Sequence, residues 1–337
     1  MVTITDVAGQ AGVSVKTVSR VMNNYEHISV KTRQKVEAAM RELGYAPKSM
    51  ARALNMSSSA GIGILYGDPS SGYQARLNHA LLKQCVGAER FLSVEYFDEK
   101  NPDWIGQAEA FLDRTKVDDL ILVPPMCDSS ELHDLFRSRQ VNFVLLSPSS
   151  SIAGASAITI DDRLASRQLT ENLIGFGHQR IAHISGRPDH VATLLRRQGF
   201  EEAMLRAGLV VPQTYIEEGR FRFANAAIAA NKLLSLPERP TAIFAANDEM
   251  AAATIMVANQ KGLRVPEDLS VVGFDDSLFA QTTWPALTTV AQPFEAMAKA
   301  ALDLLRSPIG NVETKSQTLI LEHQIIDRDS VAHAPVD

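Results

Sequence analysis

Residues 5–23 read TDVAGQAGVSVKTVSRVMN, and this stretch predicts two short helices joined by a tight turn. Thr3 and Asp6 form a capping pattern at the start of the first helix. The apolar residues of that helix recur at helical spacing, at Ile4, Val7, Ala8 and Ala11. Gly12 stands where the chain has to turn sharply between two helices, so the first helix is expected to end there.

The second helix is expected to begin at Ser14, whose hydroxyl suits a cap. Its inward face is apolar, with Val18, Val21 and Met22, and its outward face carries Val15, Lys16, Ser19 and Arg20. A third helix runs from a cap at Ser29 to a stop at Gly44, with an apolar face of Val36, Ala39, Met40 and Leu43. A single charged residue on a helix usually only coats a solvated surface. The whole pattern, in contrast, is typical of a DNA-reading head.

Charge is divided unevenly along the chain. Residues 1–60 hold 8 Lys and Arg against 4 Asp and Glu, a net charge of +4, and the total of −6 leaves −10 for residues 61–337. A nucleic-acid partner favours such a local cationic patch, because neutralised phosphates release counterions. The first 60 residues are therefore the part expected to meet DNA.

These segments closely resemble the head of the lac repressor and galactose repressor (LacI/GalR) family. The resemblance is carried by TDVA at 5–8, AGVS at 11–14, TVSRV at 17–21, KTR at 31–33, LGYAP at 43–47 and MARAL at 50–54. It extends into the large domain and covers nearly the whole chain. It implies a helix-turn-helix DNA-binding domain at 1–46, a hinge helix and linker at 47–60, and an effector-binding and dimerisation domain at 61–337.

The DNA-contacting residues fall into three groups. The first turns of the second helix place Val15, Lys16 and Arg20 where they can read base edges in the major groove. The resemblance assigns phosphate contacts to Ser14, Thr17, Ser19, Asn23, His27, Ser29 and Thr32, several of which also suit helix caps. It also implies that the hinge residues Ala51 and Leu54 contact the minor groove, with paired leucines wedged between base pairs.

Beyond the linker, apolar strand-like runs alternate with amphipathic helical stretches. The runs are 62–66, 92–97, 120–123, 143–146, 158–160, 181–184, 242–246 and 270–274. This alternation predicts parallel sheets in doubly wound α/β layers. The resemblance adds two lobes, similar to a type I periplasmic binding protein, with the chain crossing between them near residues 161, 290 and 320.

Composition is ordinary for a globular protein, with 337 residues of which 45% are hydrophobic and 21% charged. No apolar run approaches the roughly 20 residues that span a bilayer, and the chain starts without a signal-type stretch, so we expect a cytoplasmic protein without membrane association. Cys85 and Cys127 lack metal-ligand spacing and are expected to be buried thiols.

An enzyme and an exported binding protein are the competing interpretations. The run GIGILY at 61–66 starts like a dinucleotide fingerprint, but Tyr66 occupies the third glycine position. The sequence has no P-loop, nucleophile elbow or HExxH zinc motif, and His178 and His183 suit structural roles better than metal binding. We therefore expect no catalytic residues, no metal and no cofactor.

Polar residues that directly follow strands are the candidates for a ligand cleft, because ligands bind at the carboxyl ends of parallel strands. Asp161, Asn247 and Asp275 stand there, and each can be a helix cap or a ligand contact. The resemblance favours ligand contact for these three and adds Arg196, Phe221 and Tyr73, while Asp248 and Asp276 are expected to be caps.

Carboxylate, amide, guanidinium and aromatic groups together suit a sugar, which is hydrogen-bonded at its edge and stacked on its apolar face. A purine-type effector that acts as a corepressor is the alternative. The sequence thus predicts a homodimeric transcriptional repressor that binds operator DNA under the control of a small molecule. If the partners of Arg196 and Asp275 lie in the ligand, removing either residue should leave folding intact.

Overall fold

The computed structural model describes residues 2–22, 25, 28–43, 61–67, 71–98, 100–306 and 316–335. The chain divides into two compact units, Met1–Ser59 and Ala60–Asp337, which we call the head and the body. Each has its own hydrophobic core. They are treated separately below.

The head contains the helices α1 (Ile4–Ala11), α2 (Val15–Met22) and α3 (Val30–Glu42). Thr3 and Asp6 form the expected capping box at α1, and Gly12 ends this helix in the left-handed conformation, with φ of 65°. Val7 and Val18 are fully buried where the helices meet, and Val36 of α3 joins them. The helix-turn-helix predicted from the sequence is confirmed.

The body consists of two lobes, each built on a six-stranded sheet within the described residues. The N-terminal lobe has the strand order β11-β5-β4-β3-β1-β2, with all neighbours parallel. Its strands are β1 (Gly61–Tyr66), β2 (Phe91–Tyr96), β3 (Asp119–Leu122), β4 (Asn142–Leu146), β5 (Ser156–Ile160) and β11 (Thr318–Leu321). Its helices are α5 (Gly72–Gly87), α6 (Trp104–Thr115), the short η1 (Met126–Asp128), α7 (Ser130–Ser138) and α13 (Phe294–Leu305).

The C-terminal lobe has the strand order β12-β10-β9-β8-β6-β7, in which only the β10–β12 pair is antiparallel among the described strands. Its strands are β6 (Ile181–Ser185), β7 (Ile216–Glu218), β8 (Ala242–Ala245), β9 (Ser270–Asp275), β10 (Thr288–Ala291) and β12 (Gln324–Ile326). Its helices are α8 (Asp162–Gly175), α9 (Val191–Arg206), η2 (Gln213–Tyr215), α10 (Phe223–Leu233), α11 (Asp248–Gln260) and α12 (Leu278–Thr282).

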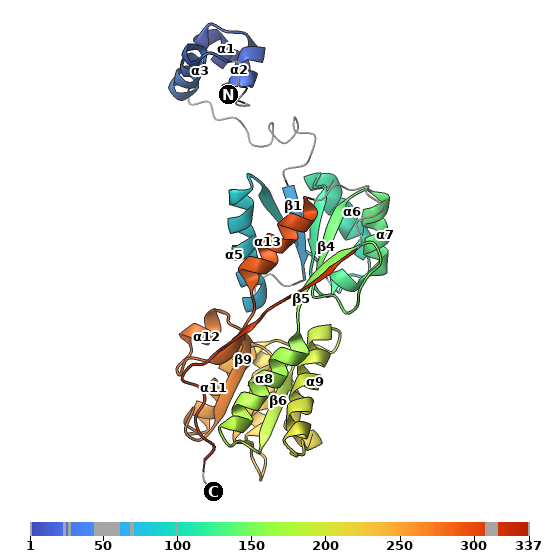
Figure 1. Ribbon diagram of the computed structural model, residues 1–337, viewed down its shortest axis with the longest axis vertical. Helices are drawn as coiled ribbons and strands as arrows, with labels where there is room; N and C mark the ends of the chain where they lie inside the picture. Colours follow the sequence, from blue (N-terminus) through green and yellow to red (C-terminus); the bar gives the residue numbers. More distant parts are fainter. Residues whose placement is uncertain are drawn as a thin grey trace. The chain divides into compact units, whose positions relative to one another are not determined.

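The chain passes between the lobes three times. It leaves the N-terminal lobe after β5, returns after β10 to form α13, and leaves again between β11 and β12. Because of the second crossing, α13 lies beside α5 in the N-terminal lobe although the two helices are far apart in the sequence (Figure 1, where α13 is orange-red). The crossings match those implied by the resemblance, and the doubly wound α/β architecture is confirmed.

All eight strand-like runs of the sequence are strands of the body. The sequence missed four strands, β7, β10, β11 and β12, which have three or four residues each. β7 reads IEE and β10 begins with two threonines, so no apolar run marks them, and the short apolar stretches of β11 and β12 have no fully buried residue. These strands are formed by pairing with neighbours already in place.

The glycines of β1 are packing residues. A side chain at Gly63 would come within 2.7 Å of the Phe111 ring, and one at Gly61 within 2.7 Å of the Phe91 ring. Both glycines are buried inside the strand. Their likeness to a dinucleotide fingerprint therefore reflects close packing. In the parts of the chain that the structure describes, we find no helix both long and apolar enough to cross a membrane.

Candidate functional site

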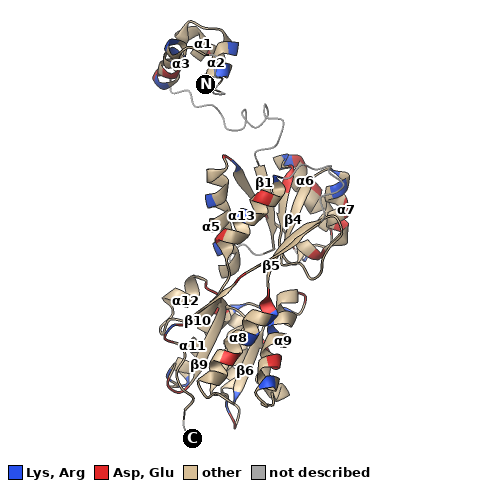
Figure 2. Ribbon diagram, in the orientation of Figure 1, with Lys and Arg blue, Asp and Glu red and all other residues tan. Residues whose placement is uncertain are grey.

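The outward face of α2 is the candidate DNA interface. Val18 and Val21 hold the helix in the head core, which leaves Val15, Lys16 and Arg20 exposed on its outer side. Figure 2 shows Lys and Arg on α2 and α3 of the head, whereas α1 has neither. The guanidinium carbon of Arg20 lies 5.2 Å from the centre of the Tyr25 ring, which limits where this side chain can point.

Two hydroxyl pairs mark the starts of α2 and α3. The Ser14 and Thr17 side-chain oxygens are 2.9 Å apart, and those of Ser29 and Thr32 are 2.8 Å apart. In each pair the serine oxygen also accepts the backbone N–H of the threonine. These side chains therefore cap their helices, and they lie at the positive helix ends where phosphates bind favourably. Their role in DNA binding remains a prediction, as does that of Ser19.

Several predicted DNA contacts lie outside the described residues. They are Asn23 and His27 of the head and Ala51 and Leu54 of the hinge segment 47–60. Their assignments stay expectations from the sequence.

A cavity of about 860 Å³, counted with the space open to solvent, is lined by residues of both lobes of the body. It lies at the carboxyl ends of the strands, as expected for open α/β sheets. The N-terminal lobe contributes Ser71, Tyr73, Gln74, Val123, Pro124 and Ser147. The C-terminal lobe contributes Asp162, Arg187, His190, Ala192, Arg196, Arg220, Phe221, Arg222, Asn247 and Asp275, and Gln292 lies where the chain crosses back.

Arg196 forms the buried centre of this cavity. Its Nε donates to Asp162 Oδ1 at 2.7 Å, and its Nη1 donates to the Ala246 carbonyl at 2.6 Å. Its guanidinium carbon lies 3.6 Å from the centre of the Phe274 ring. The partners of this arginine are therefore protein groups, contrary to the premise that they lie in the ligand.

Gly199 explains how Arg196 reaches Asp162. A side chain at this glycine would come within 2.2 Å of the Arg163 carbonyl, so only glycine lets α9 lie this close to α8. Asp162 is the first residue of α8, and Arg196 lies on the first half of α9. The close packing of α8 and α9 thus brings Arg196 within hydrogen-bond distance of Asp162.

Asp275 ends β9 opposite this pair. Gln292 donates to its Oδ1 at 2.7 Å, and Arg196 Nη2 lies 3.8 Å from the same oxygen. Burial raises the pKa of Asp275 to about 6, against the lowering effect of the charge on Arg196. The carboxyl group is therefore mostly ionised at neutral pH and can accept hydrogen bonds from ligand hydroxyls.

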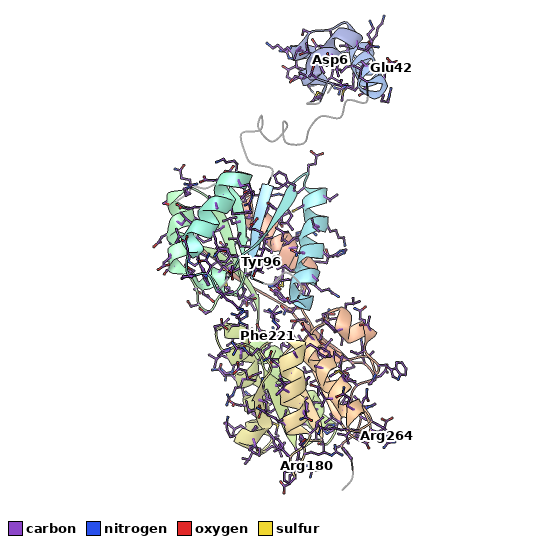
Figure 3. The ribbon with its side chains drawn as sticks, turned by 180° about the vertical axis from the view of Figure 1, so that it is seen from behind. Asp6, Glu42, Tyr96, Arg180, Phe221 and Arg264 are labelled. Atoms are coloured by element: carbon purple, nitrogen blue, oxygen red, sulfur yellow. The ribbon has the colours of Figure 1, made fainter. Side chains whose placement is uncertain are left out.

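Two aromatic residues line the cavity from opposite lobes. Phe221, labelled in Figure 3 at the end of its lobe, lies over Gly186, where any side chain would overlap its ring. Arg220 and Phe221 both have positive φ, at 55° and 59°, so the surrounding structure holds this loop in a strained conformation. The Tyr73 hydroxyl is buried and has no hydrogen-bond partner among the described residues, which leaves it for a ligand or water.

Five of the six predicted effector contacts line the cavity, and Asp161 is the exception. Its Oδ1 caps α8 by accepting the Leu164 N–H at 2.8 Å, and its side chain is exposed. The next residue, Asp162, lines the cavity instead of Asp161. The sequence predicted only Asp161, although both aspartates follow β5, and the direction of the first turn of α8 separates their roles.

The expectation that Asp248 and Asp276 are caps was wrong. Asp248 is fully buried and accepts from Thr289 Oγ1 and from the Ser277 N–H, both at 2.6 Å, so it anchors the loop after β9. Burial, with the charge of Asp275, raises its pKa to about 7. Asp276 pairs with Arg328 at 2.6 Å, and its carbonyl accepts from Arg76 of the other lobe at 2.8 Å.

Both histidines singled out by the sequence have structural partners. His178 lies 2.9 Å from the hydroxyls of Thr241 and Ser270, and His183 lies 3.0 Å from the Phe244 carbonyl. Burial lowers the pKa of His183 to about 3, so it is neutral. Within the described ranges no cluster of His, Cys, Asp and Glu could hold a metal, and Cys85 and Cys127 are buried free thiols.

Comparison with known proteins covers both units. Residues 3–48 match the family described as bacterial regulatory proteins, lacI family, and residues 170–331 match the periplasmic binding protein-like domain. The chain is 32% identical to the HTH-type transcriptional repressor PurR of Klebsiella pneumoniae (strain 342), over 99% of this chain and 98% of that protein. It is 33% identical to the ribose operon repressor of Escherichia coli (strain K12), over 98% of this chain and 100% of that protein.

Among solved structures, the chain is similar to the lac repressor dimer bound to operator and the anti-inducer ONPF. The TM-score is 0.83 and the identity is 28%, over 98% of this chain and 99% of that one. These relatives are transcriptional repressors, so the expectation that the chain is not an enzyme is confirmed.

Proposed function

The chain belongs to the LacI family of bacterial regulatory proteins, and from this premise we propose that it represses transcription as a homodimer whose operator affinity is controlled by a sugar in the cavity of the body. The observation that carries the effector site is the convergence of Asp275, Arg196 and Phe221 from three separate elements on one cavity. It is a pocket in which a small ligand can touch both lobes.

The chemistry of the lining favours a sugar. Asp275 offers an acceptor and Gln292 an amide, while Asn247 uses its carbonyl to cap α11 and so offers its N–H groups. The N-terminal lobe adds the hydroxyl of Tyr73. Donors and acceptors spread around a cavity suit the many hydroxyls of a sugar ring, and the face of Phe221 suits its apolar C–H groups. A flat purine ring could also stack on Phe221, and it remains the alternative.

Direct DNA recognition is assigned to α2. Lys16 and Arg20 are positively charged donors that favour guanine, and Val15 offers an apolar contact such as a thymine methyl group. All three are exposed on one side of the helix. The hydroxyls of Ser14 and Thr17 at the helix start support phosphate contacts from the same element.

The apolar edge of the N-terminal lobe supports a homodimer. β2 is an edge strand, and its Phe91, Val94 and Tyr96 are exposed together with Leu82 and Val86 of the neighbouring α5. An uncovered apolar edge strand is a site for association. Because the similar lac repressor structure is a dimer, we assign this face to a second copy of the chain.

The dimer is tested by sedimentation. Val86→Glu with Tyr96→Glu should weaken self-association at least tenfold and lower the affinity for a two-half-site operator. The matched control is Val210→Glu, which places a charge at an equally exposed apolar residue of the other lobe. Unchanged self-association of the double variant contradicts the assignment.

The regulatory function is tested by gel shift of operator DNA with added sugars or purines. We expect one ligand to change the operator affinity of the parent protein, and Asp275→Asn to abolish that response. Asp161→Asn is the control, because asparagine also caps helices and Asp161 lies outside the described lining. Turnover of the ligand, or an equal loss of response in both variants, would contradict the proposal.

A further inference from the structure

The charged residues of the cavity are distributed unevenly. Its described lining contains four arginines and two aspartates, and all six belong to the C-terminal lobe. The residues that line it from the N-terminal lobe are uncharged. The cavity therefore has an excess of positive charge on one wall.

Both aspartates lie beside the same buried arginine. Asp162 is paired with Arg196, and Asp275 lies 3.8 Å from the same guanidinium group. These three side chains are each about 95% buried, and one guanidinium group between two carboxylates leaves this centre without any excess of positive charge. The excess charge consequently comes from the other three arginines, Arg187, Arg220 and Arg222.

These three arginines lie on two adjacent loops. Arg187 follows β6, and Arg220 and Arg222 follow β7, its neighbour in the sheet. The Ser185 carbonyl at the end of β6 accepts the N–H of Gly219 at 2.8 Å and that of Arg220 at 3.2 Å, which ties the two loops together. The arginines are thus gathered at one end of the cavity.

The acidic partners of Arg187 and Arg220 are exchangeable. Arg187 pairs with Asp189 at 2.6 Å, and Arg220 pairs with Glu218 at 3.0 Å. Both acidic side chains are about half exposed, and the described lining of the cavity includes neither. Exposed ion pairs contribute little free energy, so the anionic group of a ligand can replace these carboxylates.

The start of α9 adds to the positive field. His190, its N-cap, makes no side-chain cap hydrogen bond and lines the cavity with Ala192 of the first turn. The N-terminus of a 16-residue helix favours an anion nearby. This observation is independent of the arginine cluster and points to the same end of the cavity.

We propose that the effector is an anionic sugar, whose phosphate ester or carboxylate is bound by Arg187, Arg220 and Arg222. Arginine binds both groups through paired N–H donors. The sugar ring then lies towards Phe221, with its hydroxyls at Asp275 and the buried arginine. This inference rests on the proposed function and specifies the ligand class of the same cavity.

Calorimetry and thermal shift on the full chain test this inference at constant ionic strength. The probes are matched sets: glucose, glucose 6-phosphate and gluconate, and ribose with ribose 5-phosphate. We expect at least one anionic sugar to bind tenfold or more tightly than its neutral counterpart. Comparing the sugar phosphates with gluconate shows whether the cavity binds a phosphate ester or a carboxylate.

The triple variant Arg187→Gln, Arg220→Gln, Arg222→Gln should lose at least tenfold in affinity for that anionic sugar. The control replaces Arg163, Arg197 and Arg206 by glutamine, which removes the same charge from α8 and α9 at exposed ion pairs. The control should bind the anionic sugar as the parent does. An equal loss in both variants would show only a general charge effect and overturn the inference.

The inference is also overturned when no anionic sugar in the panel binds more tightly than its neutral counterpart, including when a neutral sugar or hypoxanthine binds best. In that case a change of operator affinity caused by a neutral sugar still supports the proposed function, whereas one caused by hypoxanthine supports its purine alternative. The converse is distinguishable: an anionic sugar that binds through the three arginines without changing operator affinity contradicts the proposed function alone.

Discussion

Replacing Arg196 by methionine should destabilise the body strongly. Arg196 is 5% exposed and Asp162 is 3% exposed, and their hydrogen bond is 2.7 Å long. Methionine fills much of the space but leaves the Asp162 carboxylate buried without its cation. Removing one member of a buried ion pair costs about 3–5 kcal/mol.

A neighbouring group moderates this effect. The charge of Arg196 lowers the pKa of Asp275, which burial raises to about 6. Without the arginine this pKa rises further, so Asp275 takes up a proton near neutral pH and the repulsion between the two carboxylates falls. We therefore expect the lower half of the range, about 3–4 kcal/mol, at pH 6 and the upper half at pH 8.

The unfolding free energy is measured by urea denaturation with tryptophan fluorescence as the signal. This signal reports on the body, because Trp104 and Trp284 both belong to it. Asp162→Asn alone should also destabilise, since it leaves a buried guanidinium group partly uncompensated. The double variant Arg196→Met with Asp162→Asn should cost at least about 2 kcal/mol less than the sum of the single changes. Additive losses, or a loss below about 1 kcal/mol for Arg196→Met, refute the ion-pair argument.

Further predictions concern the head, the hinge and the pH dependence. Arg20→Ala should cost roughly 1–3 kcal/mol at the cognate operator and relax preference at one base, and an unchanged preference across a randomised operator library contradicts it. Thr3→Ala removes the capping box and should lower the unfolding free energy of the head by about 0.5–2 kcal/mol, measured by hydrogen exchange of α1. Leu54→Ala, outside the described residues, should reduce operator bending measured by energy transfer between labelled DNA ends; full bending excludes the wedge. Burial raises the pKa of Asp248 from 3.8 to about 7, so its contribution to stability is present below pH 4 and lost as the pH rises through 7. The Tm of the parent should therefore exceed that of Asp248→Asn by more at pH 5 than at pH 8, and a constant difference contradicts the assigned pKa.

Local sequence was sufficient for the head and for eight strands of the body, most of them buried. The capping box at Thr3, the left-handed turn at Gly12 and the apolar spacing of α2 each act within a few residues, so the pattern alone predicts them. The buried strands of the body are continuous apolar runs, which are visible for the same reason. The short strands β10, β11 and β12 were missed because partners distant in the sequence stabilise them.

Only the tertiary structure decided which polar side chains share the cavity. Asp161 and Asp162 are equivalent by sequence, and the first turn of α8 directs one to the solvent and the other to Arg196. Gln292 has no local signal, since it meets Asp275 only because the chain crosses between lobes beside β9. The grouping of Arg187 with Arg220 and Arg222 depends in turn on the pairing of β6 with β7. Helix caps and periodicity depend on residues a few positions apart, whereas a cavity is made by packing distant segments together, and a single sequence does not specify those distances.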